Sequence, residues 1–146
     1  MVECWIFDVD GTLANAEHRK DHVRKKPKRW DLWNAKMAGD SFHEDVGNFV
    51  NIAKVSGKKI IICTGREEFY REVTHNWLEK YGVSYDLMLM RRTKDYRSDD
   101  IVKKEMLDEM RAIGYNPTLV FDDRDRVVKM WRENGLRCFQ VAEGDF

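Results

Sequence analysis

The sequence lacks any hydrophobic run long enough to cross a membrane. A membrane-spanning helix needs about 20 consecutive apolar residues, and every apolar stretch in this chain is much shorter. The amino-terminal residues also show neither a secretory signal pattern nor a lipidation motif. We therefore expect a protein without a membrane anchor.

Cysteine is scarce, and its spacing argues against a thiolate metal site. The three cysteines, Cys4, Cys63 and Cys138, each lie in a different apolar segment. Structural zinc sites combine two closely spaced pairs of cysteine or histidine, and the three cysteines and four histidines of this chain do not form such a set. Buried, reduced thiols are therefore expected, which favours a cytoplasmic location.

Neither sign of charge is in excess. Lysine plus arginine and aspartate plus glutamate number 26 each in the 146 residues. A strongly cationic protein can hold nucleic acid through its overall charge; in this chain any such contact has to be local. The length predicts one domain over residues 1–146.

Short apolar segments alternate with segments of helical periodicity. In the first apolar segment, Trp5–Leu13, only the beginning is predicted to be a strand. The other four predicted strands are whole segments: Lys59–Thr64, Asp86–Met90, Thr118–Phe121 and Cys138–Ala142. Each predicted helix is followed by a glycine: Glu44–Ser56, Glu67–Lys80, Asp99–Ile113 and Asp125–Asn134. This alternation predicts an α/β fold with a Rossmann-like, open, mostly parallel five-stranded sheet flanked by helices.

One region, Asn15–Ser41, does not follow the alternation and is interpreted as an insertion over the active edge of the sheet. We expect part of it, around Trp30–Met37, to be helical. The basic run Arg24–Arg29 precedes Trp30 and Trp33. These residues could bind a single strand, with cations on phosphates and indoles on bases, or form a solvated face with packed tryptophans.

Carboxylates follow the first predicted strand directly. The motif Asp-Val-Asp-Gly-Thr places Asp8 and Asp10 where that strand ends, and α/β sheets bind ligands at this edge. An Asp-Gly hairpin turn is the alternative, but the polar, basic residues that follow do not suit a second strand. We therefore expect Asp8 and Asp10 to face a bound ligand.

The ends of the other predicted strands complete a constellation. Thr64-Gly65-Arg66 ends the second strand and Asp122-Asp123 the fourth, while Lys103 lies on the helix after the third. The four aspartates Asp8, Asp10, Asp122 and Asp123 would then meet in an oxygen site of the kind that Mg²⁺ prefers. Thr64, Arg66 and Lys103 would bring hydrogen-bond donors and positive charge for a dianionic phosphate.

These four motifs, in this order, resemble those of the haloacid dehalogenase (HAD) superfamily of phosphohydrolases. The sequence is also similar, over essentially its whole length, to the 3′-phosphatase domains of bacteriophage polynucleotide kinases. The similar segments read FDVDGTLA, TGRE, MRRTKDYRSDDIVKKE, FDDRDRVVKMW and QVAEGDF. The insertion departs from the phage sequences, and it is expected to affect the choice of substrate.

The resemblance implies a role for each motif residue. Asp8 would attack phosphorus and form an aspartyl-phosphate. Asp10 would act as general acid and then base; to start protonated it would need a raised pKa, which its acidic neighbours would supply. The Asp10 main-chain carbonyl would hold Mg²⁺ together with the other three aspartates. Thr64, Gly65 and Lys103 would bind the phosphoryl group.

Four further residues match positions that the polynucleotide phosphatases use beyond the general HAD set: Arg19, Arg66, Arg91 and Asp99. Arginine can bind phosphate in bidentate fashion, which suits a substrate with a phosphate backbone. These residues are therefore predicted to bind substrate.

The predicted function is Mg²⁺-dependent removal of the 3′-phosphate from DNA or RNA ends. A 5′/3′-nucleotidase or small-metabolite HAD phosphatase is the alternative, and a non-catalytic binding module is a third reading that would require a lost motif residue. The chain has no GxxxxGK[ST] motif, so a 5′-kinase would be a separate partner chain. A ligase partner and a homo-oligomer are also compatible with this interpretation.

Overall fold

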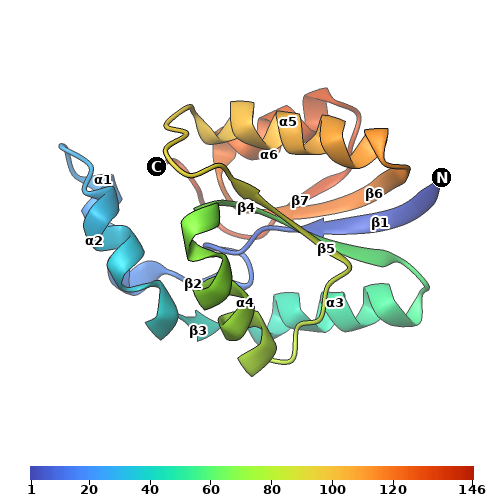
Figure 1. Cartoon of the computed structure of the whole chain (residues 1–146), viewed down its shortest axis with the longest axis horizontal. Coiled ribbons are helices and arrows are strands. Elements are labelled where there is room, and N and C mark those ends of the chain that lie inside the picture. The colour runs from blue at the N-terminus through green and yellow to red at the C-terminus, as the bar shows by residue number, and fades with distance from the viewer.

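The computed structural model describes residues 1–146 and is centred on a five-stranded sheet (Figure 1). Its strands are β1 (Val2–Phe7), β4 (Lys59–Glu67), β5 (Leu87–Arg91), β6 (Tyr115–Asp122) and β7 (Cys138–Gln140). They run in the order β5-β4-β1-β6-β7, and every neighbouring pair is parallel. The predicted sheet is thus confirmed, and β1 lies at its centre.

Helices cover both faces of the sheet. In Figure 1, α5 (Asp99–Ala112) and α6 (Asp125–Glu133) lie on one face, and α3 (Glu44–Val55) and α4 (Arg71–Lys80) on the other. Successive side chains of a strand point to opposite faces. Accordingly Ile6 is buried in the core against α5 and α6, whereas Phe7 is buried in the core against α3 and α4.

Several predicted boundaries were wrong. Strand β1 begins at Val2 and not at Trp5, and β7 ends at Gln140 and not at Ala142. The helix predicted from Glu67 begins only at Arg71, because β4 continues to Glu67, where it pairs with Arg91 of β5 after a shift in register. A 3₁₀ turn over Glu68–Tyr70 follows. Strand β6 begins at Tyr115, three residues before the predicted Thr118, because Tyr115 pairs with Val2 at the start of β1.

The insertion is a small subdomain closed by a short antiparallel pair. Strand β2 (Ala14–Asn15) pairs with β3 (Ser41–Phe42), and between them lie α1 (Asp21–Arg24) and α2 (Trp30–Ala35). Figure 1 shows the subdomain to one side of the sheet, beyond the end at which β1 leads into β2. Trp33 is buried there, as expected for a tryptophan that packs into the domain, whereas Trp30 is 43% exposed.

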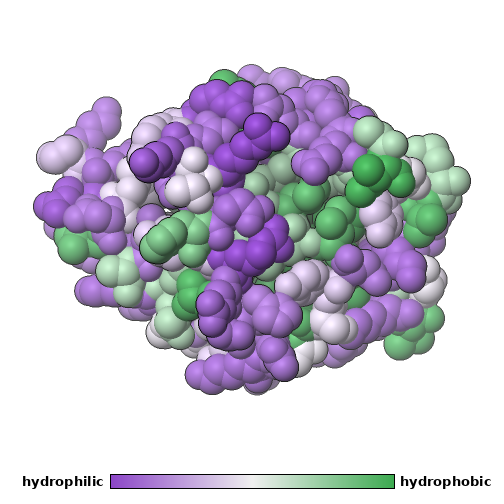
Figure 2. Space-filling view, in the orientation of Figure 1, coloured by the Kyte–Doolittle hydropathy of each residue, from purple (hydrophilic) through white to green (hydrophobic).

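The face of the molecule drawn in Figure 2 is mostly hydrophilic. Figure 2 shows polar and charged residues over most of one face, with hydrophobic residues mainly on the side where the chain begins. None of the helices is long and apolar enough to span a bilayer. All three cysteines are buried and unpaired, as expected.

Candidate active site

A tight turn carries the chain away from the end of β1. The main-chain N–H groups of Thr12 and Ala14 both donate to the carbonyl of Val9, at 3.1 and 2.8 Å. Gly11 in this turn has φ of +83°, and a Cβ there would lie 2.0 Å from Oδ2 of Asp123. Only glycine therefore allows the first acidic motif to approach the Asp123 side chain so closely.

Three carboxylates meet beside this turn. Oxygens of Asp8, Asp122 and Asp123 all lie within 4.8 Å of one another, and the three residues are buried. Burial and the charge of Asp122 raise the pKa of Asp8 well above its ordinary value, and they raise that of Asp123 to about 7. Three of the four aspartates predicted to meet here therefore do so, whereas the side chain of Asp10 does not join them.

The cluster suits a hard divalent cation. Oδ2 of Asp123 is buried and has no hydrogen-bond partner, and an unpaired buried oxygen of this kind is costly unless something neutralises it. The donors are all carboxylate oxygens, which Mg²⁺ prefers over nitrogen or sulfur ligands. The residues present thus fit the metal that the fold family implies.

Lys103 is the buried cation in contact with the three-carboxylate cluster. From α5 its Nζ donates to Asp8 Oδ1 and Asp122 Oδ2, both at 2.9 Å, and lies 3.8 Å from Asp99 Oδ2. Burial would lower the pKa of Lys103, but the surrounding carboxylates outweigh it and raise the pKa. The second oxygen of Asp8 accepts the Thr12 hydroxyl at 3.1 Å. Asp8 is therefore held through both oxygens.

Asp10 faces arginines and lies apart from the three-carboxylate cluster. Its carboxylate accepts Nη2 of Arg66 at 2.8 Å and Nη2 of Arg19 at 2.5 Å. Burial alone would raise the pKa of Asp10, but the two guanidinium groups outweigh burial and hold it well below its usual range. The expectation of a raised pKa was wrong, because arginines are the nearest charges to this side chain.

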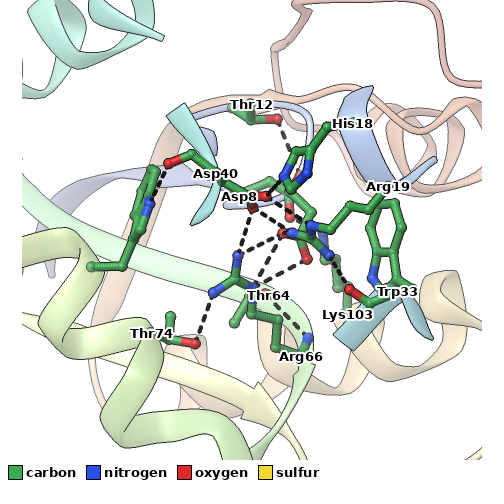
Figure 3. Close-up of polar contacts among 12 residues, drawn as sticks. Asp8, Thr12, His18, Arg19, Trp33, Asp40, Thr64, Arg66, Thr74 and Lys103 are labelled. Carbon is green, nitrogen blue, oxygen red and sulfur yellow. Dashed lines mark hydrogen bonds and ion pairs between the residues drawn. The ribbon is translucent and has the colours of Figure 1, made fainter. Parts of the chain in front are cut away.

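Asp40 is a site residue that the sequence did not identify. Its side chain is fully buried at the end of the insertion and accepts Nε of Arg19 at 2.8 Å and Nη2 of Arg66 at 3.4 Å (Figure 3). It follows no predicted strand and belongs to no recognised motif. No signal in a single sequence distinguishes it from a surface aspartate.

The predicted phosphate-binding residues Thr64–Arg66 form an irregular, loop-like part of β4, at the shift in register before Glu67. Thr64 is buried, and its hydroxyl accepts the main-chain N–H of Arg66 at 3.1 Å. Arg91 donates from Nε to the Gly65 carbonyl at 2.8 Å and from Nη2 to Asp99 Oδ1 at 3.1 Å. Here Arg91 and Asp99 support the loop, and their contact with substrate stays a prediction.

Glycine allows a close approach at residue 65 as well. A Cβ at Gly65 would lie 2.4 Å from Oδ1 of Asp99. The close approach places the loop beside the amino-terminal end of α5, the helix that carries Lys103. The second and third motifs therefore meet, as the sequence predicted.

A cleft of about 340 Å³ opens over these residues. Asp8 and Asp10 line it, and so do side chains of the insertion and of the loop after β5. Among them Trp30 and Tyr96 are exposed aromatics. Lys28 and Arg126 also line the cleft and form no ion pair. The buried carboxylates thus lie in a cleft that also holds exposed aromatic rings and two cations without an acidic partner.

A family model of the polynucleotide kinase (PNKP) phosphatase domain, a HAD family, matches residues 2–146. The chain belongs to this family. It is accordingly a HAD-type phosphatase domain, a phosphoric monoester hydrolase, and the sequence-based assignment to this group is confirmed.

Individual relatives agree with the PNKP phosphatase assignment. The chain is 39% identical to a protein in the structure of a Pnkp1/Rnl/Hen1 complex, with a TM-score of 0.87, covering 100% of this chain and 48% of that one. It is 30% identical, over 130 residues, to a protein of Autographa californica nuclear polyhedrosis virus named "Putative bifunctional polynucleotide kinase/RNA ligase". That match covers 88% of this chain and 17% of the viral protein.

A more distant structure shares the fold. The class C acid phosphatase from Bacillus anthracis, solved with tungstate, is 20% identical, with a TM-score of 0.65 over 86% of this chain and 53% of that one. This chain thus spans about half the length of the two structural matches and a smaller share of the viral protein.

Proposed function

We propose that this domain removes the 3′-phosphate from polynucleotide ends in a Mg²⁺-dependent reaction through an aspartyl-phosphate on Asp8, leaving a hydroxyl. The observation that carries the proposal is the setting of Asp8. Its carboxylate belongs to the three-carboxylate cluster and is held by Lys103 and Thr12, at the edge of the sheet where α/β folds bind ligands.

The first step would be attack of an Asp8 oxygen on phosphorus, which breaks the bond to the sugar oxygen. Lys103 would neutralise charge on the nucleophile and on the phosphoryl group. Main-chain N–H groups after Thr64 would bind the phosphoryl oxygens. When bound, Mg²⁺ would neutralise the carboxylates and the phosphate, held by Asp8, Asp122, Asp123 and the Asp10 carbonyl.

Asp10 would act as the general acid in the first step and as the general base in the second. It would give a proton to the departing sugar oxygen and later take one from the water that hydrolyses the aspartyl-phosphate. Because Arg19 and Arg66 keep Asp10 anionic in the substrate-free protein, the proton it delivers has to be acquired as the phosphate ester binds. The anion is already in the correct form for the second step.

A polynucleotide suits the cleft better than a small phosphate ester. Trp30 and Tyr96 offer exposed rings on which bases can stack. Lys28 and Arg126 have no acidic partner and could pair with backbone phosphates. The balanced overall charge is the feature that favours the nucleotidase or small-metabolite alternative, since polynucleotide affinity would then depend on these few residues.

The names of the relatives suggest the setting of the reaction. A kinase and an RNA ligase are named together in the viral relative, and Rnl and Hen1 accompany the structural relative. We therefore propose a role in nucleic-acid end repair, with a 5′-kinase or a ligase as partner. The buried, unpaired cysteines favour the cytoplasm as its location. A ligase requires a 3′-hydroxyl, which this reaction would supply.

A substrate panel tests the proposal. Purified protein with Mg²⁺ is given 3′-phosphorylated RNA and DNA oligonucleotides, a 5′-phosphorylated oligonucleotide, a 3′-mononucleotide and a sugar phosphate. We expect phosphate release with the highest kcat/KM from a 3′-phosphorylated oligonucleotide and no turnover by Asp8→Asn. Efficient turnover of the mononucleotide or sugar phosphate without turnover of the oligonucleotides would contradict it.

A further inference from the structure

Asp40 contacts both of the arginines that hold Asp10. Arg19 and Arg66 each bridge the two carboxylates, so two anions and two cations form a closed, charge-balanced set (Figure 3). The side chains of Asp40, Arg19 and Arg66 are at most 1% exposed. Charge-assisted, bidentate contacts of this kind fix orientation where water is excluded.

The two arginines have no nitrogen left free. Nη1 of Arg19 donates to the Trp33 carbonyl at 3.1 Å, and Nη1 of Arg66 donates to the Thr74 hydroxyl at 3.0 Å. Their remaining guanidinium nitrogens all contact Asp10 or Asp40. In this arrangement the arginines bind protein acceptors, so their role in the substrate-free enzyme is to orient carboxylates.

Asp40 is itself held from two sides. Its main-chain carbonyl accepts the indole N–H of Trp77, on α4, at 2.9 Å. Nε2 of His18 lies 2.6 Å from its Oδ1. The last residue before β3 is thus tied to α4 through its main chain, and through its carboxylate to the start of the insertion and to both arginines.

We infer that Asp40 is a positioning residue for Asp10: it fixes Arg19 and Arg66, which in turn hold the Asp10 carboxylate where it can reach the leaving oxygen. The inference rests on the proposed function, in which Asp10 protonates that oxygen. It gives the insertion a part in catalysis in addition to any part in choosing the substrate.

Two leaving groups separate positioning of an acid from general damage. The sugar oxygen of a 3′-phosphorylated oligonucleotide needs a proton as it departs, whereas p-nitrophenolate departs from p-nitrophenyl phosphate without one. We expect Asp40→Asn to lower the single-turnover rate of leaving-group release about 30-fold to 100-fold on the oligonucleotide but less than about 3-fold on the aryl phosphate. KM should be unchanged for both.

Three variants calibrate the measurement. Asp10→Asn should show the same selective loss, only larger, and Asp8→Asn should lose release from both substrates. Asp31→Asn makes the same change at an exposed position of the same insertion, and both rates should stay at the wild-type level.

Equal losses on the two substrates, or full activity on the oligonucleotide, would overturn the role of Asp40. If Asp10→Asn itself shows no selectivity, the assignment of Asp10 fails and this inference fails with it, a result distinct from a failure of Asp40 alone. Should Asp40→Asn not fold, Trp77→Phe removes the indole hydrogen bond to Asp40 and keeps an aromatic ring, although a smaller one, in the core. It should give a selective loss of about 3-fold to 10-fold, and an unselective loss would overturn the inference.

Discussion

At the scale of single residues, the site is a balance of buried charges. Asp8, Asp122 and Asp123 repel one another, and Lys103 compensates only part of that charge because its Nζ contacts the first two. Asp123 keeps an unpaired oxygen. We expect the repulsion between these carboxylates to destabilise the metal-free protein, and a bound divalent cation to reduce it.

This charge balance predicts the behaviour of Asp123→Asn. Removing one of three clustered carboxylates should raise the free energy of unfolding in chelator at pH 8 by about 2 kcal/mol, since burial and Asp122 hold the Asp123 pKa near 7. Denaturant unfolding measures the change. The variant should also lose most of the stabilisation that Mg²⁺ gives the wild type; an unchanged response to Mg²⁺ would argue against Asp123 as a ligand.

Lys103 predicts the opposite effect on stability. Lys103→Met removes the only lysine between Asp8 and Asp122, so it should lower the free energy of unfolding by about 3 kcal/mol and phosphatase activity by at least about 100-fold. Lys104→Met, on the next residue of α5, breaks only an exposed pair with Asp108 and is the matched control. Comparable activity in the two variants would remove Lys103 from the mechanism.

At the scale of elements, motifs were easier to predict than contacts. The strand ends that carry Asp8, Thr64 and Asp122 could be predicted because a buried parallel strand has a continuous apolar pattern and its polar end is abrupt. Asp40 could not, because its importance comes from two arginines that are distant in sequence. The start of α4 was misplaced because Phe69 fits the helical period of the residues that follow. In the structure β4 pairs with β5 as far as Glu67, and Phe69, just beyond, is 75% exposed.

We expect a change in the insertion to weaken the binding of an oligonucleotide substrate selectively. Trp30→Ala removes an exposed ring from the cleft, so KM for a 3′-phosphorylated oligonucleotide should rise about 5-fold to 50-fold, with KM for p-nitrophenyl phosphate unchanged. Lys36→Ala, an exposed change on the same insertion outside the cleft, is the control. Equal KM values for Trp30→Ala and wild type on the oligonucleotide would show that the strand does not pass over α2.

At the scale of the whole molecule, acidic and basic residues are equal in number but are separated in space within the cleft. The acidic groups gather where β1 and β6 end, while cations without partners lie farther out in the same cleft. Composition alone could therefore exclude binding through bulk charge, but it could not show this local arrangement. The fold was predictable from alternation, and the separation of charge needed the structure.

Metal addition tests the site at this scale. Mg²⁺ at 100 times its dissociation constant should stabilise the native state by about 2.7 kcal/mol, seen as a higher Tm in a thermal unfolding scan and reversed by chelator. The Asp8→Asn, Asp122→Asn double variant should show almost no rise. A rise of the same size in that variant would place the ion elsewhere on the molecule.

The central claim is that Asp8 accepts the phosphoryl group from a polynucleotide 3′ end. The most direct measurement is a rapid acid quench of a single turnover with an oligonucleotide that carries a radiolabelled 3′-phosphate, followed by peptide mapping of the protein. We predict transient label on the peptide that contains Asp8 and none on the Asp8→Asn protein. Label on any other peptide, or complete turnover by Asp8→Asn, would contradict the account.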